Sequence, residues 1–300
     1  MDLSIIIINY NTKELTKQTL QSIFDKKYDF TYEVFVVDNA SIDDSVDMIK
    51  TEFPQVKLVE NSENLGFSKA NNLAIKASTG RLILLLNSDT LVLEDCLEKC
   101  VVYMENHETI GALGCKVMLS NGMLDHACKR GFPTPDAALY YMLKLDKLFP
   151  DSRRFGQYDL TYLCENEMNE VDVLTGAFMM VRREVIDEVD LLDENFFMYG
   201  EDIDWCYRIK RAGWRIVYYP EAKIIHYKGG SNKKKKTKIV YEFHRAMYLF
   251  YKKHYNEKYN TLVKGLVYMG IGVKLMVSVF INLLKKRGGD YDQGKSKDTK

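Results

Sequence analysis

Four short apolar runs in residues 1–105, each followed by a segment of helical spacing, constrain the fold of this chain more than any other feature. The apolar runs are residues 3–8, 33–37, 56–59 and 81–86. The segments of helical spacing are residues 12–24, 41–53, 66–77 and 93–105. Such alternation with short connections is typical of a parallel sheet wrapped by helices. We therefore expect an α/β fold, with Ser41 and Asp44 forming a capping box for the second helix.

Polar side chains follow each apolar run. The clusters are Asn9-Tyr10-Asn11, Asp38-Asn39, Asn61 to Asn64, and Asn87-Ser88-Asp89. Ligands of open parallel sheets bind beyond the carboxyl ends of the strands. One such cluster could be ordinary loop polarity, but four at consecutive strand ends favour a binding site at this edge of the sheet.

The rest of the sequence is less regular. Residues 170–181 are predicted to form a strand broken by Gly176, and residues 215–219 a short strand. Residues 201–212 are predicted to form an amphipathic helix. Residues 239–254 and 262–286 are predicted to form two further helices. We expect a catalytic domain at 1–230, a basic helical region at 231–287 and an unstructured end at 288–300.

Charge is distributed unevenly along the chain. Lysine and arginine number 42, as do aspartate and glutamate, so the formal net charge is zero. The part from Lys228 onward holds 18 basic and 5 acidic residues, a net charge of +13, and the part before it carries −13. One basic end favours a local anionic partner over a nucleic acid.

The cysteines and the first residues indicate the compartment. The six cysteines include no CxxC pair, which favours buried thiols in a reducing environment over a zinc site or disulfides. Met1 and Asp2 lead directly into an apolar run without a basic leader. We therefore expect the chain in the cytosol.

Two carboxylates close predicted strands. Asp89 follows the fourth strand, where an oxygen ligand could hold Mg²⁺ or Mn²⁺ and bridge it to substrate phosphates. A simple turn is the alternative for this tripeptide. Asp38 closes the second strand and could accept a hydrogen bond from a base or a ribose, or instead form an Asx turn.

Three further segments are candidates for the site. Gly66 permits a close backbone approach at the start of a helix that carries Asn71, and a helix N-terminus favours a diphosphate. Residues 197–204 place Glu201 and Asp202 after an aromatic loop, where partial burial suits a general base, although acidic residues also decorate ordinary helix starts. His226 could bind a metal or a leaving phosphate, or be structural.

Taken together, these segments resemble the family 2 glycosyltransferases of the GT-A fold. The resemblance covers about residues 3–230 and most resembles the rhamnosyltransferase branch that builds bacterial surface polysaccharides. The matching pieces are SIIIINYN, VFVVDNASIDDS, NSENLGFSKANN, LLLNSD, LTGAFMMVRR, FFMYGEDIDWCYRIKRAGWRI and HYKGGS.

The resemblance implies a role for each candidate residue. The residues that would contact the nucleotide-sugar are Asn9, Tyr10, Asp38, Asn39, Gly66, Asn71 and Asn87. Asp89 would hold the metal, with Asn87 in place of the usual first Asp of a DxD triplet, and His226 would face the diphosphate or the metal. Asp202 would be the catalytic base of an inverting reaction, and Glu201 would contact acceptor or donor.

The implied donor is dTDP-rhamnose, with a UDP-sugar as the alternative, and the implied acceptor is a lipid-linked saccharide. Two other activities stay open: a nucleotidyltransferase, against which Asn9-Tyr10-Asn11 replaces the expected Gly-rich basic loop, and a nucleotide-sugar-binding protein without catalysis. Hydrolysis of nucleotide sugars with and without Mn²⁺ separates these three.

The basic end of the chain is predicted to meet a membrane. Lys233 to Lys236 and Lys238 precede two apolar segments. In the second, Lys274, Ser278, Asn282 and Lys285 fall on one helical stripe, opposite Val273, Val277, Phe280 and Leu284. We expect a helix in the interface of an anionic membrane, its lysines meeting headgroups, with the enzyme peripheral on the inner face of the bacterial cell membrane. A membrane span and a homo-oligomer interface are the alternatives.

Overall fold

The computed structural model describes the backbone of residues 1–228 and 236–294, and the side chains of residues 1–228 and 237–282. The chain forms two compact units. The first is Met1–Phe197 with Glu201–Ser231, and the second is Met198–Gly200 with Asn232–Lys300. The last three residues of the HYKGGS motif, Gly229, Gly230 and Ser231, lie outside the described residues, as do Lys233 to Lys235.

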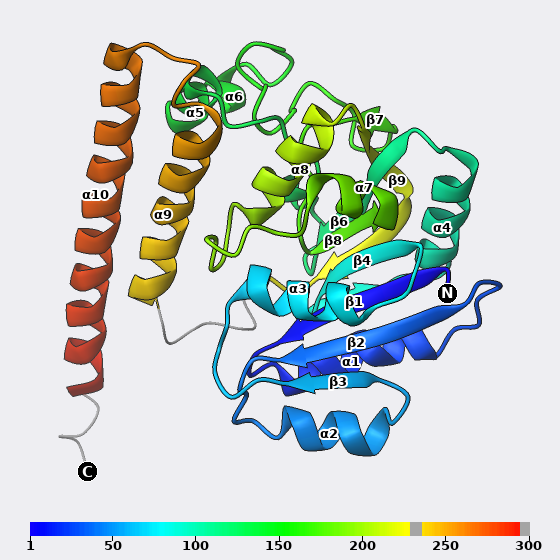
Figure 1. Cartoon of the computed structure of the whole chain (residues 1–300). Helices are drawn as coiled ribbons and strands as arrows, with labels where there is room; N and C mark the ends of the chain where they lie inside the picture. Colours follow the sequence, from blue (N-terminus) through cyan, green and yellow to red (C-terminus); the bar gives the residue numbers. More distant parts are fainter. Residues whose placement is uncertain (229–235, 295–300) are drawn as a thin grey trace. The chain divides into compact units, whose positions relative to one another are not determined.

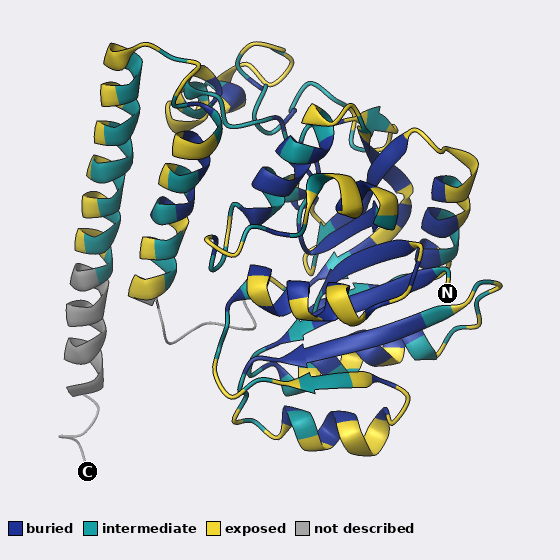
Figure 2. Ribbon diagram, viewed as in Figure 1, coloured by how far each residue is buried: buried dark blue, intermediate teal, exposed yellow. Residues whose placement is uncertain are grey.

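A nine-stranded sheet forms the centre of the first unit, in the order β3-β2-β1-β4-β8-β6-β9-β5, with β7 pairing to β9 (Figure 1). The strands are β1 (Leu3–Asn9), β2 (Tyr32–Asp38), β3 (Lys57–Glu60), β4 (Leu82–Asn87), β5 (Thr90–Val92), β6 (Ile110–Leu119), β7 (Asn169–Glu170), β8 (Phe178–Arg182) and β9 (Arg215–His226). The first four strands are parallel, which confirms the expected arrangement. The side chains of β1, β2 and β4 are mostly buried on both faces (Figure 2), which explains their nearly continuous apolar sequence, whereas the edge strand β3 is partly exposed.

Helices flank this sheet (Figure 1). They are α1 (Lys13–Phe24), α2 (Ser45–Glu52), α3 (Phe67–Ala77), α4 (Cys96–Asn106), α5 (Pro135–Met142), α6 (Leu145–Leu148), α7 (Arg183–Val189) and α8 (Glu201–Arg211), with a short 3₁₀ turn, η1, at His126–Cys128. Five of the six cysteines are buried in this unit and all six are free, whereas Cys164 is exposed.

The structure corrects three local predictions. Ser41 does not cap a helix: its hydroxyl oxygen accepts bonds from Asn9 and from the backbone N–H of Asn11, and α2 begins only after Asp44. The strand at 170–181 is broken at Gly176 as predicted, but the break is wider than expected, because residues 171–177 separate β7 from β8. The last strand, β9, continues to His226 instead of ending at residue 219, since it pairs with three other strands.

The second unit contains two long helices, α9 (Lys236–His254) and α10 (Thr261–Gly294). They pack through aromatic side chains, including the ring of Tyr268, which lies 5.4 Å from the rings of both Tyr248 and Tyr251. The helix α10 runs past Gly288, where we expected the unstructured end to begin, and residues 295–300 lie outside the described residues.

Candidate functional site

The ends of β1 and β2 are fixed by a buried network of side chains. Asn9 donates to Asp38 Oδ1 at 2.6 Å and accepts from the hydroxyls of Thr12 and Thr16, each at 2.7 Å. Asp38 Oδ2 accepts the backbone N–H of Ser41 at 2.8 Å. Asn9 and Asp38 are almost fully buried, so in this structure they hold the strand ends and the loops that carry more exposed side chains such as Tyr10.

A second set of contacts joins β2 to the start of α3. Asn39 donates to the carbonyl of Gly66 at 3.0 Å. Gly66 has a φ of +82°, and a Cβ there would lie 2.4 Å from the carbonyl oxygen of Phe197, so any side chain is excluded. The close approach predicted for Gly66 is thus made to the chain itself. Asn71 donates to the carbonyl of Phe67, and its buried Oδ1 has no partner among the described residues.

His226 at the end of β9 faces the Asn-Ser-Asp triplet after β4. Its Nε2 lies 3.1 Å from Asp89 Oδ1 and 3.3 Å from Asn87 Nδ2. Asp89 is only 6% exposed, and the ring of His226 lies against its carboxylate. The antiparallel pairing of β5 with β9 brings Thr90 opposite His226 and so fixes this approach. The structure therefore brings His226 to Asn87 and Asp89, which lie more than a hundred positions earlier in the sequence.

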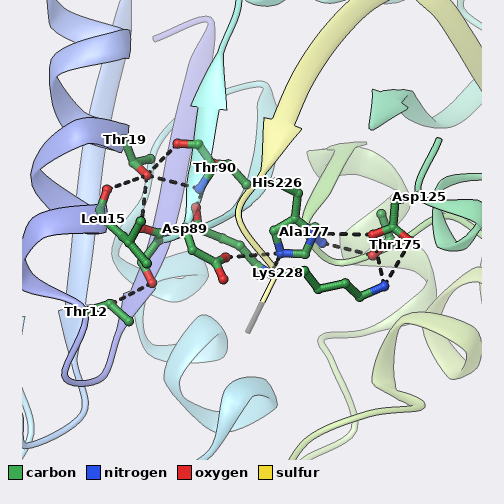
Figure 3. Close-up of polar contacts among 12 residues, drawn as sticks. Thr12, Leu15, Thr19, Asp89, Thr90, Asp125, Thr175, Ala177, His226 and Lys228 are labelled. Carbon is green, nitrogen blue, oxygen red and sulfur yellow. Dashed lines mark hydrogen bonds and ion pairs between the residues drawn. The ribbon is translucent and has the colours of Figure 1, made fainter. Parts of the chain in front are cut away.

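Asp125, which the sequence analysis did not single out, completes this cluster (Figure 3). Its Oδ2 lies 3.4 Å from His226 Nδ1, and both of its oxygens accept bonds from Lys228 Nζ, at 3.0 and 3.1 Å. Burial alone would lower the pKa of His226, but the carboxylates of Asp125 and Asp89 outweigh it and raise that pKa to about 9. Burial would raise the pKa of Asp125, but His226 and Lys228 hold it well below its usual range.

Asp202, at the first turn of α8, forms a close ion pair with Arg130. An Nη atom of Arg130 donates to Asp202 Oδ2 at 2.6 Å, and the backbone N–H of Ile203 donates to Oδ1 at 2.8 Å. Arg130 also donates to the carbonyl oxygens of Ala127 and Leu174. These contacts fix the orientation of the Asp202 carboxylate. No local pattern marks Arg130 or Asp125 in the sequence, because their partners are distant along the chain.

The carboxyl group of Glu201, beside Asp202, differs from that of Asp202 in its burial and its hydrogen bonds. Its side chain is 6% exposed and its Oε2 has no hydrogen-bond partner among the described residues. Burial, together with the negative charge of Asp202, raises the pKa of Glu201 to about 8. An uncharged carboxyl group at neutral pH can donate a hydrogen bond as well as accept one, so Glu201 is suited to binding a hydroxyl group.

Comparison with known proteins identifies the family. The model of glycosyltransferase like family 2 matches residues 2–242. The chain belongs to this family. The match covers the sheet, the Asp89–His226 pair and the Asp202–Arg130 pair, so all the charged groups described above lie within the family region.

Several curated proteins are similar to this family 2 glycosyltransferase. It is 26% identical over 229 residues to the N-acetylglucosaminyl-diphospho-decaprenol L-rhamnosyltransferase of Mycobacterium tuberculosis, covering 72% of this chain and 73% of that protein. It is 27% identical over 240 residues to rhamnosyltransferase WbbL of Escherichia coli, covering 76% and 84%. It is also 27% identical over 230 residues to a low-salt glycan biosynthesis hexosyltransferase, Agl10, of Haloferax volcanii, covering 75% and 67%.

Solved structures show the same fold. The mannosyltransferase of Pyrobaculum calidifontis, in complex with GDP-Man and Mn²⁺, matches with a TM-score of 0.58 at 17% identity, covering 92% of this chain and 72% of that one. Staphylococcus aureus TarS, in complex with UDP-GlcNAc, matches with a TM-score of 0.56 at 18% identity, covering 89% and 70%. The fold of this glycosyltransferase is therefore GT-A, as the sequence predicts.

The donor atoms present fit a divalent cation that is shared with a substrate. Within the described ranges, no group of three or more His, Cys, Asp or Glu side chains is arranged to hold a metal ion. Asp89 would supply one oxygen, and His226 would supply one nitrogen once its Nε2 has released the proton that the two carboxylates stabilise in this structure. Mg²⁺ and similar cations are commonly held by one or two protein ligands together with substrate phosphates and water. A nucleoside diphosphate would therefore complete such a site.

Proposed function

We propose that this chain is an inverting glycosyltransferase that transfers rhamnose from dTDP-rhamnose to a lipid-linked saccharide, with Asp202 as the general base. The observation that supports it most is that one short segment holds both charged clusters. Asp125 contacts His226, Arg130 contacts Asp202, and Ala127 between them bonds to both Asp125 and Arg130. The choice of rhamnose rests on the two similar rhamnosyltransferases.

The residues of the chain would divide the reaction between them. Asp202 would accept the proton of the acceptor hydroxyl as that oxygen attacks the anomeric carbon, so no covalent enzyme intermediate forms. Arg130 would keep the Asp202 carboxylate in place during this transfer. Asp89 and His226 would hold Mn²⁺ or Mg²⁺, which when bound neutralises negative charge on a leaving diphosphate. Lys228, whose side chain is 57% exposed, would add positive charge at this edge.

Two measurements test the donor and the reaction. Isothermal titration with dTDP and with UDP should show tighter binding of dTDP, and a preference for UDP would replace rhamnose with the alternative UDP-sugar donor. Turnover of dTDP-rhamnose with N-acetylglucosaminyl-diphospho-decaprenol should show transfer in the presence of Mn²⁺ and little or none in its absence. Nucleotide binding with neither transfer nor hydrolysis would instead indicate a binding protein without catalysis.

We also propose that the second unit attaches the enzyme to the cytoplasmic face of the membrane. The residues Thr261–Asn282 of α10 are long and apolar enough to cross a bilayer, with a mean hydropathy of 1.6. Exposed apolar side chains recur every three or four residues along this helix, at Leu262, Leu266, Met269, Val273, Met276, Val277, Phe280 and Ile281. Lys274 does not face outward as expected: it lies over the ring of Phe243 of α9, 5.6 Å from its centroid. The outward face is thus apolar, which suits lipid more than water.

A triple variant of the full chain tests this attachment. Leu266→Gln/Met269→Gln/Val273→Gln should reduce flotation with phosphatidylglycerol vesicles, whereas Val102→Gln, an exposed apolar site on α4, should not. High salt should weaken binding of the wild type only in part, because screening acts on the basic residues and not on the apolar face. Resistance to both salt and carbonate extraction would show that α10 spans the bilayer. Equal flotation of the variant and the wild type would contradict the proposal.

A further inference from the structure

The segment that contains α5 and α6 exposes an unusual number of large apolar side chains for part of a catalytic domain. The side chains are between 42% and 68% exposed in Leu139, Tyr141, Met142, Leu143, Leu148 and Phe149. We call these six residues the α5–α6 patch. Six such side chains within eleven positions concentrate apolar exposure in one short segment, whereas exposed apolar residues that are scattered singly are ordinary.

The exposure of this patch does not come from a loose backbone. The hydroxyl of Thr134 caps α5 by accepting the N–H of Ala137, and Pro135 occupies the first turn. Tyr140 and Phe149 both pack against Phe155, with ring centroids 5.1 and 5.4 Å apart. These contacts hold the segment while leaving its apolar side chains in water, which is unfavourable unless a partner covers them.

Basic side chains lie among the apolar ones. Lys144 and Lys147 are exposed within the patch, and Arg153 and Arg154 are exposed just after it. Arg154 donates to the Tyr140 hydroxyl at 3.1 Å. Of the carboxylates in this stretch, Asp146 is buried and Asp136 is bonded to Thr134 and Gln157. Asp151 is exposed, but the four exposed cations outnumber it. Apolar side chains among exposed cations complement an anionic lipid surface, where the cations meet headgroups and the apolar groups enter the acyl region.

A series of side-chain contacts connects the α5–α6 patch to Asp202, the proposed base. The ring of Tyr141 lies 5.0 Å from the ring of Tyr158, Tyr158 interacts with the guanidinium of Arg130, and Arg130 holds Asp202 at 2.6 Å. All these residues belong to the first unit, so the path does not depend on α9 or α10. A surface seated on the patch would thus lie close to the carboxylate that receives the acceptor's proton.

We propose that the α5–α6 patch docks on the surface of an anionic phospholipid bilayer and places the Asp202 site at the headgroup layer. A lipid-linked acceptor presents its saccharide in that layer, so the patch would select acceptors that stay in the membrane. This inference rests on the proposed function for the choice of acceptor, but bilayer contact can be measured without any sugar donor.

The direct test places a tryptophan in the patch of the full chain. Leu148→Trp should lose about half or more of its added fluorescence on vesicles of phosphatidylglycerol and brominated phosphatidylcholine, because interfacial apolar groups enter the acyl boundary. Val102→Trp, at a position on α4 that is 47% exposed, should not be quenched. The emission of the native Trp205 and Trp214 is measured in the wild type and subtracted from that of each variant. Loss of quenching with Lys144→Gln/Lys147→Gln would support the headgroup contacts.

Two outcomes would overturn the proposal that the α5–α6 patch contacts the bilayer. If the chain floats with the vesicles while Leu148→Trp stays unquenched, the patch does not contact the bilayer and the proposal is wrong. If the Leu148→Trp emission shifts with protein concentration in the absence of vesicles, a second copy covers the patch instead, which also overturns it. Quenching in a protein that fails to turn over dTDP-rhamnose would support the docking surface while contradicting the proposed reaction.

A second variant connects the patch to the reaction. Leu143→Gln/Leu148→Gln replaces two side chains that are 58% and 68% exposed, so the fold should be retained. Transfer to a vesicle-borne polyprenyl-diphosphate acceptor should fall by about tenfold, while binding of dTDP stays unchanged, because only access to the bilayer is lost. The matched control is Val102→Gln/Met168→Gln, which removes two similarly exposed apolar side chains elsewhere. Equal losses in both variants would contradict a specific role of the patch.

Discussion

Two charged clusters of the first unit both combine carboxylates with cations, but in different numbers. Around His226, two carboxylates, Asp89 and Asp125, face two cations, because Lys228 also binds Asp125. Around Arg130, the two carboxylates Asp202 and Glu201 share one cation, and only Asp202 bonds to it. The first cluster is therefore balanced in charge, whereas the second keeps Glu201 buried with a raised pKa. The balanced cluster suits the binding of charged groups, and the unbalanced one suits proton transfer.

The largest effect on transfer should come from removing the carboxylate of Asp89 in the His226 cluster. Asp89→Ala should abolish transfer, since the protein would keep only His226 as a ligand for the divalent cation. The fold should be retained, because the described contact of the Asp89 side chain is with His226, while its backbone carbonyl still accepts the N–H of Tyr227. Thermal unfolding checks the fold, and titration with Mn²⁺ checks binding. Full activity of the wild type in excess EDTA would contradict a metal role.

Within the second cluster, the proposed base should show the next largest effect. Asp202→Asn keeps the size of the side chain but cannot accept the proton, so turnover should fall by on the order of 10²-fold or more while donor binding is largely kept. Glu201→Gln is the matched comparison, since it changes the neighbouring carboxyl in the same way. If Glu201→Gln loses turnover and Asp202→Asn does not, the two carboxyl groups have exchanged roles.

The sequence predicts the parallel half of this fold well and the charged clusters only in part. The first four strands and their helices each carry a local period, and the structure confirms them. Asp89, Glu201 and Asp202 stand at ends of such elements, where a local pattern also marks them. Asp125 and Arg130 lie in the irregular stretch between β6 and α5, where no period applies. Their roles depend on partners about 70 and 100 residues away, which only the fold brings near.

The orientation of the polar and apolar faces of α10 shows a second limit of prediction from local sequence patterns. The sequence separates an apolar stripe from a stripe through Lys274 but does not say which of them is covered. In the structure the tyrosine-rich helix α9 packs against the polar stripe of α10, as the position of Lys274 over the ring of Phe243 shows. An amphipathic pattern is usually read with its apolar face inward. Here the exposed side chains of Val273, Val277 and Phe280 show that the apolar face of α10 points outward.

A smaller change should sharpen the role of Asp125. A carboxylate that accepts from one nitrogen of a metal-bound histidine fixes the orientation of the ring, and losing it typically costs about 10-fold to 100-fold in metal affinity. Asp125→Asn should therefore weaken binding of Mn²⁺, measured by electron paramagnetic resonance, by about 10-fold, while binding of dTDP without metal changes little. Asp151→Asn, an exposed carboxylate in the same domain, is the control. Equal Mn²⁺ affinity in both variants would show that Asp125 only holds Lys228.

The smallest effect concerns stability and follows from the unpaired carboxyl group. The pKa of Glu201 is raised to about 8 by burial and by Asp202, from an ordinary value near 4.5. Between these values the unfolded chain releases a proton that the folded chain retains. The stabilisation linked to this proton is therefore complete below about pH 4.5 and is lost as the pH rises through about 8, by at most about 1.4 kcal/mol for each pH unit.

Glu201→Gln removes this titration without removing the shape of the side chain. The melting temperatures of the variant and the wild type should be similar near pH 5, and the wild type should fall below the variant as the pH approaches 8. All other groups titrate in both proteins, so the difference between the two curves isolates Glu201. Adding Asp202→Asn should reduce this difference, because the neighbouring negative charge contributes to the raised pKa of Glu201. Parallel curves from pH 5 to pH 8 would mean that Glu201 is ionised in the folded protein, and that the two charged clusters differ less than their geometry indicates.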